Sequence, residues 1–250
     1  MIHFRDISKT FGTGTGNEIR ALHPLNLEIK DKEFVVLIGS NGSGKSTVMN
    51  LLSGALRPDQ GQILVDGQDI TTLPEHQRCK YLSRVFQNPL SGTAPELSIE
   101  ENFRLATIRT QPKGFRIGNN DAFRKTVRER IASLNLGLES KLNQPMGSLS
   151  GGQRQALTLL MATMDDSKIL LMDEPTAALD PATSKLILDI AEKMVQEMGL
   201  TAILITHQMK DVIRYGNRLI QLKEGKVIRD FPKIQKQEIQ LNELINWFGD

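Results

Sequence analysis

Short apolar runs divide this chain into strand-like segments. Three of them are continuous and rich in β-branched or long aliphatic residues, which is typical of strands buried on both faces of a parallel sheet; they cover 34–38, 169–172 and 202–205. Ahead of the first, Leu25, Leu27 and Ile29 alternate with polar residues and predict a half-buried strand. Further strands are predicted at 61–67 and 81–86, and a hairpin at 218–222 and 227–229.

Helical periodicity appears between these strands. The segment Ser98-Ile99-Glu100-Glu101 has the spacing of a capping box and predicts the start of a helix. Asp121 is predicted to cap a second helix, whose apolar stripe is Phe123, Val127, Ile131 and Leu134. Its other face is basic, which is typical of a solvated surface, although an acidic partner or lipid head groups would also suit it. Asp180-Pro181 predicts the start of a third helix, which ends at Gly199.

The last stretch has apolar residues at the spacing of an amphipathic helix, namely Leu241, Leu244, Ile245 and Phe248. We expect this helix to dock on its own domain; a dimer contact or a regulatory contact is the alternative. Together the patterns predict an α/β protein whose core comes from two sequence-distant parts, about 1–87 and 167–230. A mostly helical insert is expected at about 88–166, and the C-terminal helix within 231–250.

Composition narrows the classes of function. The chain has 250 residues, 39% of them hydrophobic and 24% charged, which is ordinary for a soluble globular protein. The formal net charge of +2 argues against a strongly electrostatic nucleic-acid binder, so no nucleic-acid partner is expected. No apolar run approaches the ~18 residues of a membrane span, and the N-terminus lacks the apolar core of a signal peptide. The lone Cys79 suits a reducing cytosol.

A phosphate-binding loop lies between the first buried run and the helix predicted after it. Residues 39–47 fit G-x-x-x-x-G-K-[ST] at every fixed position. In a strand–loop–helix context, backbone N–H groups point at a polyphosphate, Lys45 reaches the outer phosphates and Ser46 holds a magnesium ion. The alternative, a Gly/Ser-rich turn that contains a lysine by chance, does not explain both flanks. The predicted ATP contacts are Ser40, Asn41, Gly42, Ser43, Gly44, Lys45, Ser46 and Thr47.

Two adjacent carboxylates follow the second buried run. Asp173 ends that run and is placed to act near the magnesium, and Glu174 could accept a proton from an attacking water as general base. Carboxylates at the end of a buried strand are rarely there for packing, because an unpaired buried charge is costly. A solvent-exposed acidic turn is the alternative.

Two weaker signals complete the set. Ser150-Gly151-Gly152-Gln153 begins a predicted helix, where Ser150 is a good cap and the glycines leave backbone N–H groups uncovered for an anion. Phe11 starts a glycine-rich loop, where its ring could stack on a flat ligand such as adenine or cover the edge of the core. Neither signal assigns a function by itself.

With these motifs in hand, residues 1–230 resemble an ATP-binding cassette ATPase, the nucleotide-binding subunit of an ABC transporter. The segment Leu149–Gln153 matches that family's signature motif, and the phosphate loop, residues 169–174, Gln87 and His207 stand in family order. The resemblance implies a P-loop NTPase core of the RecA-like type, an antiparallel β subdomain and a helical insert. It also implies hydrolysis of ATP with Mg²⁺.

The resemblance further implies a role for each site residue. In such proteins two subunits close head to tail, so that Ser150 and Gly152 of one contact the γ-phosphate on the loop of the other. Gln87 is implied at the magnesium and the attacking water, and His207 at the γ-phosphate. Asp180 is implied in the loop that joins the two sites. One chain would therefore hold half of each site.

The implied function is ATP hydrolysis that powers transport, by a chain that is peripheral on the cytoplasmic face of the membrane. The resemblance also places Phe11 at the adenine. Residues 83–94 resemble a bacterial group assigned to uptake, with amino acids among the candidate substrates. The expected partners are a second copy of the chain, permease subunits and an extracytoplasmic substrate-binding protein.

Two other functions stay open. One is an exporter or lipoprotein-release ATPase, which the loop 12–17 also resembles. The other is a soluble ABC ATPase without a transport function. A long coiled-coil insert with sustained heptads would favour a DNA-repair member of that class, and the sequence has none.

Overall fold

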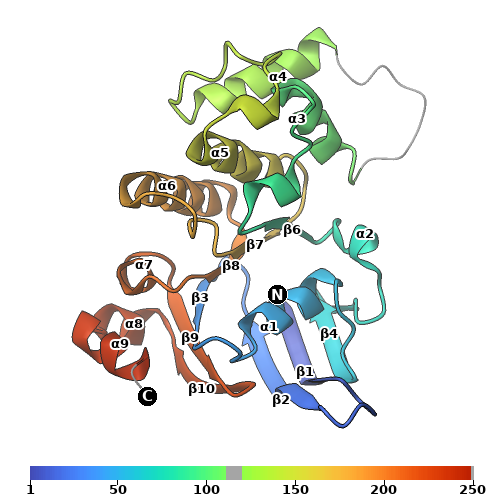
Figure 1. Ribbon diagram of the computed structural model, residues 1–250, viewed down its shortest axis with the longest axis vertical. Coiled ribbons are helices and arrows are strands. Elements are labelled where there is room, and N and C mark those ends of the chain that lie inside the picture. The colour runs from blue at the N-terminus through green and yellow to red at the C-terminus, as the bar shows by residue number, and fades with distance from the viewer. Residues whose placement is uncertain (111–119, 249–250) are drawn as a thin grey trace.

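A computed structural model describes residues 1–110 and 120–248, and its centre is a six-stranded sheet (Figure 1). In spatial order its strands are β10 (Lys226–Phe231), β9 (Arg218–Lys223), β3 (Phe34–Ile38), β8 (Thr201–Ile205), β7 (Ile169–Asp173) and β6 (Leu82–Val85). Every neighbouring pair is parallel except β9 with β10, which form the predicted hairpin. The three continuous apolar runs are therefore adjacent buried strands, as predicted.

Each central strand is apolar on both faces because both faces are covered. In β3, Val35 and Leu37 belong to one core cluster, which also includes Met49 from α1 (Lys45–Ser53). Phe34 faces the other side, in a cluster with residues of α5 (Gly151–Ala162) and α6 (Pro181–Met198). The carboxyl ends of β3 and β7 thus carry the phosphate loop and the two carboxylates at one edge of the sheet.

A second sheet of four strands packs beside the first (Figure 1). Its order is β2 (Ile19–Ile29), β1 (Ile2–Phe11), β4 (Gln60–Val65) and β5 (Gln68–Asp69), all antiparallel. The predicted alternation in β2 is confirmed, since Leu25, Leu27 and Ile29 are buried between exposed neighbours. The short helix α2 (Glu75–Arg78) follows this sheet.

A group of helices lies at the far end from this second sheet (Figure 1). They are α3 (Ile99–Thr107), α4 (Asp121–Ala132) and α5; the 3₁₀ turn η1 (Pro89–Gly92) precedes α3, and η2 (Met146–Ser148) lies between α4 and α5. The capping box predicted at Ser98 is present. The prediction for α4 was wrong by one residue, because Asn120 rather than Asp121 is the cap, accepting a hydrogen bond from Phe123 N at 2.8 Å. Most of the loop predicted at 111–120 lies outside the described residues.

The C-terminal helix predicted through Leu241, Leu244, Ile245 and Phe248 is confirmed as α9 (Leu241–Phe248). A further short helix, α8 (Lys233–Glu238), precedes it and was not predicted. Docking on the chain's own core is confirmed: Leu244 is fully buried against a cluster that includes Val212 of α7 (Met209–Arg214), and Trp247 stacks on Phe231 with 5.3 Å between ring centroids. Among the described residues, no helix is both long enough and apolar enough to cross a membrane.

Candidate active site

The phosphate loop has a backbone that only glycine accepts at two points. Gly44 has φ 103°, and a Cβ there would lie 2.8 Å from the carbonyl oxygen of Ala21. At Gly39, with φ 152°, a Cβ would lie 2.2 Å from Leu222 O. Gly44 also precedes α1 and supplies no side-chain cap, so the first N–H groups of this helix keep their donors for an anion. The helix predicted after the loop is confirmed, and it begins earlier than the predicted first turns at 48–52, already at Lys45.

Two side chains of the loop, Lys45 and Ser43, have polar groups buried within it. Lys45 is buried, and its Nζ donates to Gly39 O at 2.8 Å and to Ser40 O at 3.0 Å. Burial lowers the pKa of Lys45, while the carboxylates of Glu174 and Asp173 act in the opposite direction. Ser43 Oγ is buried and has no hydrogen-bond partner within the described residues. A buried hydroxyl without a partner and uncapped N–H groups are what a polyphosphate would satisfy.

The two carboxylates after β7 have different surroundings. Asp173 is the last residue of the strand and is mostly buried. Glu174 lies one residue further, with φ 47°, a left-handed conformation that is uncommon for a residue with a side chain. Its Oε1 lies 2.8 Å from His207 Nε2. The structure therefore joins two residues that were predicted separately, and left-handed strain of this kind concentrates at functional sites.

Each residue predicted to hold magnesium offers an oxygen atom, namely the Ser46 hydroxyl, the Asp173 carboxylate and the carbonyl oxygen of the Gln87 amide. Mg²⁺ prefers oxygen ligands and is usually bound by one or two carboxylates together with substrate phosphates. Across residues 1–110 and 120–248 no group of three or more His, Cys, Asp and Glu side chains is arranged for a metal ion. The donor set thus fits a magnesium ion that is held together with the nucleotide.

Gln87 and Phe11, the other two predicted site residues, are both exposed. Gln87 is exposed two residues beyond the end of β6, and the preceding carbonyl, Phe86 O, accepts a hydrogen bond from Gln155 at 3.4 Å. Phe11 ends β1 opposite Ile19, with 39% of its surface exposed. Ala21, two residues further along β2, is the residue that Gly44 approaches. The Phe11 ring is accessible beside the loop, where the adenine was predicted.

The exposed start of α5 carries the predicted signature residues. Ser150 caps the helix through a capping box: its Oγ accepts from Gln153 N at 3.2 Å, and Gln153 Oε1 accepts from Ser150 N at 3.2 Å. Gly151 and Gly152 follow, and a Cβ at Gly152 would lie 2.3 Å from Thr183 Cγ2. Gly152 is therefore needed for close packing of α5 on α6, whatever else it contacts.

Figure 1 shows α5 well separated from α1, the helix that begins at the phosphate loop.

Asp180 is the predicted residue of the loop that joins the two sites. Its carboxylate caps α6 by accepting from Ala182 N and Thr183 N at 3.0 Å each. A hydrogen bond with the Thr183 side chain, together with these backbone N–H groups, holds the pKa of the Asp180 carboxyl below its usual value. The helix start predicted at Asp180-Pro181 is confirmed.

One residue of this region was not predicted. Arg84 on β6 makes an ion pair with Asp173 at 2.7 Å, across 89 positions of sequence. The available signal was a charged residue inside a predicted strand, two residues after Leu82 and directly before Val85. Sequence alone did not say which partner it would meet.

The parallel sheet, the phosphate loop and the acidic end of β7 define a nucleoside triphosphatase of the P-loop class. The sequence matches the family described as ABC transporter over residues 22–177, more than half of the chain, and the chain belongs to that family. It is an ATP-hydrolysing subunit of a transporter, and the predicted fold is confirmed.

Similar proteins span the whole chain. It is 37% identical over 251 residues to the tyrosine transport ATP-binding protein of Clostridioides difficile strain R20291, covering 99% of this chain and 98% of the relative. It is 33% identical over 235 residues to the macrolide export ATP-binding/permease protein MacB of Nitrosomonas europaea, covering 92% of this chain and 34% of MacB. The dimeric ATP-binding cassette MJ0796, bound to ADP and phosphate, has a TM-score of 0.79 at 31% identity, over 93% and 98% of the two chains.

Proposed function

We propose that two copies of this chain form two ATP sites, each built from the phosphate loop of one copy and the start of α5 of the other. The observation that carries this proposal is the separation of the two elements within one chain, while both are exposed (Figure 1). Ser150 Oγ only accepts a hydrogen bond in its capping box, so its proton remains a donor for a phosphate oxygen. A cassette with 31% identity is a dimer bound to ADP and phosphate, which supports this arrangement.

In this proposal Glu174 is the general base. His207 lies against its carboxylate and orients it, and the same histidine is proposed to contact the γ-phosphate when ATP is bound. When ATP is bound, Lys45 Nζ would donate to the outer phosphates of the nucleotide instead of to the carbonyls of Gly39 and Ser40. A magnesium ion held by Ser46, Asp173 and Gln87 would neutralise charge on the phosphates. Catalysis then depends on positioning and charge, with Glu174 taking the proton of water.

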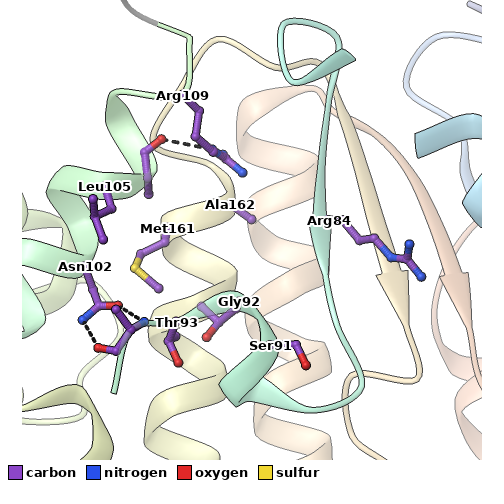
Figure 2. Close-up of a pocket in the computed structure, with 12 residues that line it drawn as sticks. Arg84, Ser91, Gly92, Thr93, Asn102, Leu105, Arg109, Met161 and Ala162 are labelled. Carbon is purple, nitrogen blue, oxygen red and sulfur yellow. Dashed lines mark hydrogen bonds between the residues drawn. The ribbon is translucent and has the colours of Figure 1, made fainter. Parts of the chain in front are cut away.

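We also propose that permease subunits contact a groove between η1, α3 and α5. The groove has a volume of about 320 Å³, and the side chains that border it include Thr93, Leu105 and Met161 (Figure 2). Leu105 is 45% exposed, so an apolar face is available to a partner. The Asn102 amide holds Ala94 by accepting from its N–H at 2.8 Å and donating to its carbonyl at 2.9 Å, which makes the η1 wall rigid. The chain would then sit on the cytoplasmic face of the membrane.

The transported solute is proposed to be an amino acid such as tyrosine, taken up with the help of an extracytoplasmic binding protein. This proposal rests on the full-length match to a tyrosine transport protein. The match to MacB, a macrolide exporter that also includes a permease, supports export as the second candidate. The direction of transport is therefore the property to test.

Uptake into vesicles separates these functions. The chain is reconstituted with its permease so that ATP and the chain face the lumen, and labelled tyrosine is supplied outside. We expect ATP-dependent accumulation of tyrosine, which is lost with Lys45→Ala. ATP-dependent loss of preloaded solute would favour export instead. Recovery of the chain only from cytosol, with no co-purified membrane protein, would contradict a transport function.

A further inference from the structure

Arg84 connects three parts of the site. Its Nη2 donates to Asp173 Oδ2 at 2.7 Å, and its Nη1 donates to Asn50 Oδ1 at 2.7 Å. Its guanidinium lies over the ring of Phe86, 4.9 Å from the centroid. Asn50 belongs to α1, which begins at the phosphate loop, and Phe86 directly precedes Gln87. One planar, permanently charged fork therefore ties the helix of the loop to the magnesium carboxylate and to the glutamine segment.

These contacts are made away from bulk water. The side chains of Arg84 and Asp173 are only 14% and 17% exposed. Arg84 Nε is buried without a hydrogen-bond partner in the described part of the chain. The position of the side chain therefore leaves one of its N–H donors unsatisfied. A shielded ion pair is little weakened by salt, and removing one partner leaves a buried charge uncompensated. The pair is therefore a fixed feature of the site rather than a mobile surface contact.

Arg84 also lies beside the groove between η1, α3 and α5. Figure 2 shows its side chain directed away from the other labelled residues of the groove, while it still forms part of the lining. Its guanidinium thus meets Asp173 on one side of β6, and the rest of the residue borders the groove. A partner seated in the groove would be one residue away from the carboxylate that serves the nucleotide.

We propose that Arg84 is a positioning residue for magnesium binding. It fixes the position of Asp173 Oδ2 relative to α1, and the other carboxylate oxygen remains available for the magnesium. It contacts neither nucleotide nor metal itself. This inference rests on the magnesium role proposed for Asp173. Groups that orient a metal-binding side chain typically contribute about 10–100-fold to metal affinity.

Calorimetric titration with adenylyl imidodiphosphate, a non-hydrolysable ATP analogue, tests this role without any hydrolysis. The analogue is titrated in EDTA and at a series of magnesium concentrations. For Arg84→Met we expect unchanged affinity in EDTA, because the phosphate loop is intact. The magnesium concentration that gives half of the gain in affinity should rise about tenfold. Arg84→Lys should give a smaller rise, since it keeps the charge at Asp173 but cannot also reach Asn50 as a planar fork.

Arg109→Met is the matched control. Arg109 lines the same groove and makes an arginine–aspartate pair of the same length, 2.7 Å to Asp165, but it does not contact the site. It should show the wild-type magnesium dependence. If Arg84→Met does not fold, Arg84→Lys carries the test, and binding in EDTA reports its folding.

Asp173→Asn separates the two hypotheses. If Asp173→Asn loses the magnesium dependence while both Arg84 variants keep the wild-type value, the positioning role of Arg84 is wrong and the magnesium site stands. If Asp173→Asn also behaves as wild type, the proposed magnesium role of Asp173 fails, and the inference about Arg84 fails with it. Equal loss of affinity in EDTA and in magnesium would likewise contradict the inference, because it would indicate a general structural effect.

Discussion

Replacing Glu174 by glutamine is expected to leave ATP binding intact and to slow hydrolysis by about 10²–10⁴-fold, the usual contribution of a general base. Glutamine keeps a carbonyl oxygen that can accept from His207 Nε2, so the 2.8 Å contact and the turn around it survive. The change removes only the group that takes a proton from the attacking water. A closed, ATP-bound dimer should accumulate, because closure is favoured by bound ATP and hydrolysis no longer removes it.

Phosphate release and light scattering in ATP measure both effects. Glu224→Gln is a suitable control because Glu224 is also a left-handed glutamate, with φ 49° against 47° for Glu174, but lies in the turn between β9 and β10. The control should hydrolyse ATP at the wild-type rate and should not accumulate as a dimer. If Glu174→Gln hydrolyses ATP like the wild type, Glu174 is not the base.

Replacing Ser150 by arginine should abolish hydrolysis while sparing ATP binding. The exposed start of α5 lies apart from the chain's own phosphate loop, so a change there does not reach the nucleotide that the chain binds (Figure 1). Loss of the cap costs about 1 kcal/mol of stability, which a folded chain tolerates. The bulky, charged side chain would block the approach of a second copy. Gly152 is a poorer probe, because a side chain there clashes with Thr183 inside the chain.

ATP binding and phosphate release are measured for Ser150→Arg, and closure of the dimer is measured by light scattering of the double variant Ser150→Arg/Glu174→Gln. Ser98→Arg provides the control, because Ser98 caps α3 through the same kind of capping box. That control should keep hydrolysis, since α3 is not proposed to meet the nucleotide. A Ser150→Arg chain that still closes into an ATP-bound dimer would overturn the role across subunits.

Much of the fold was predictable because local signals agreed with the tertiary structure. The apolar runs at 34–38, 169–172 and 202–205 are strands of one parallel sheet, and the caps at Ser98 and Asp180 begin helices. The C-terminal helix α9 was predicted, but the short helix α8 before it was not, because the contacts that hold it are distant in sequence. Lys236 is buried and donates to the carbonyls of Tyr215 and Gly216, which fixes α8 separately from α9.

The site was predictable as a set of motifs and less so as a set of contacts. Positions in the phosphate loop and after β7 follow from spacing, since backbone geometry determines where those residues point. The pairing of Glu174 with His207, and of Arg84 with Asp173, depends on which strands lie side by side. That order arises from long-range packing. The motifs therefore predict the chemistry, and only the fold shows which side chains support it.

The central claim is that each ATP site needs two copies of the chain, and mixing two inactive variants tests it most directly. Lys45→Ala disables the phosphate loop, and Ser150→Ala removes the hydroxyl that is proposed to donate to the γ-phosphate without adding bulk that would block a second copy. Each alone should show little ATP hydrolysis. A mixed dimer pairs the intact loop of one with the intact α5 start of the other, so the mixture should regain about a quarter of the wild-type rate, because random pairing makes half of the dimers mixed. A mixture that stays as inactive as either variant alone would contradict the claim.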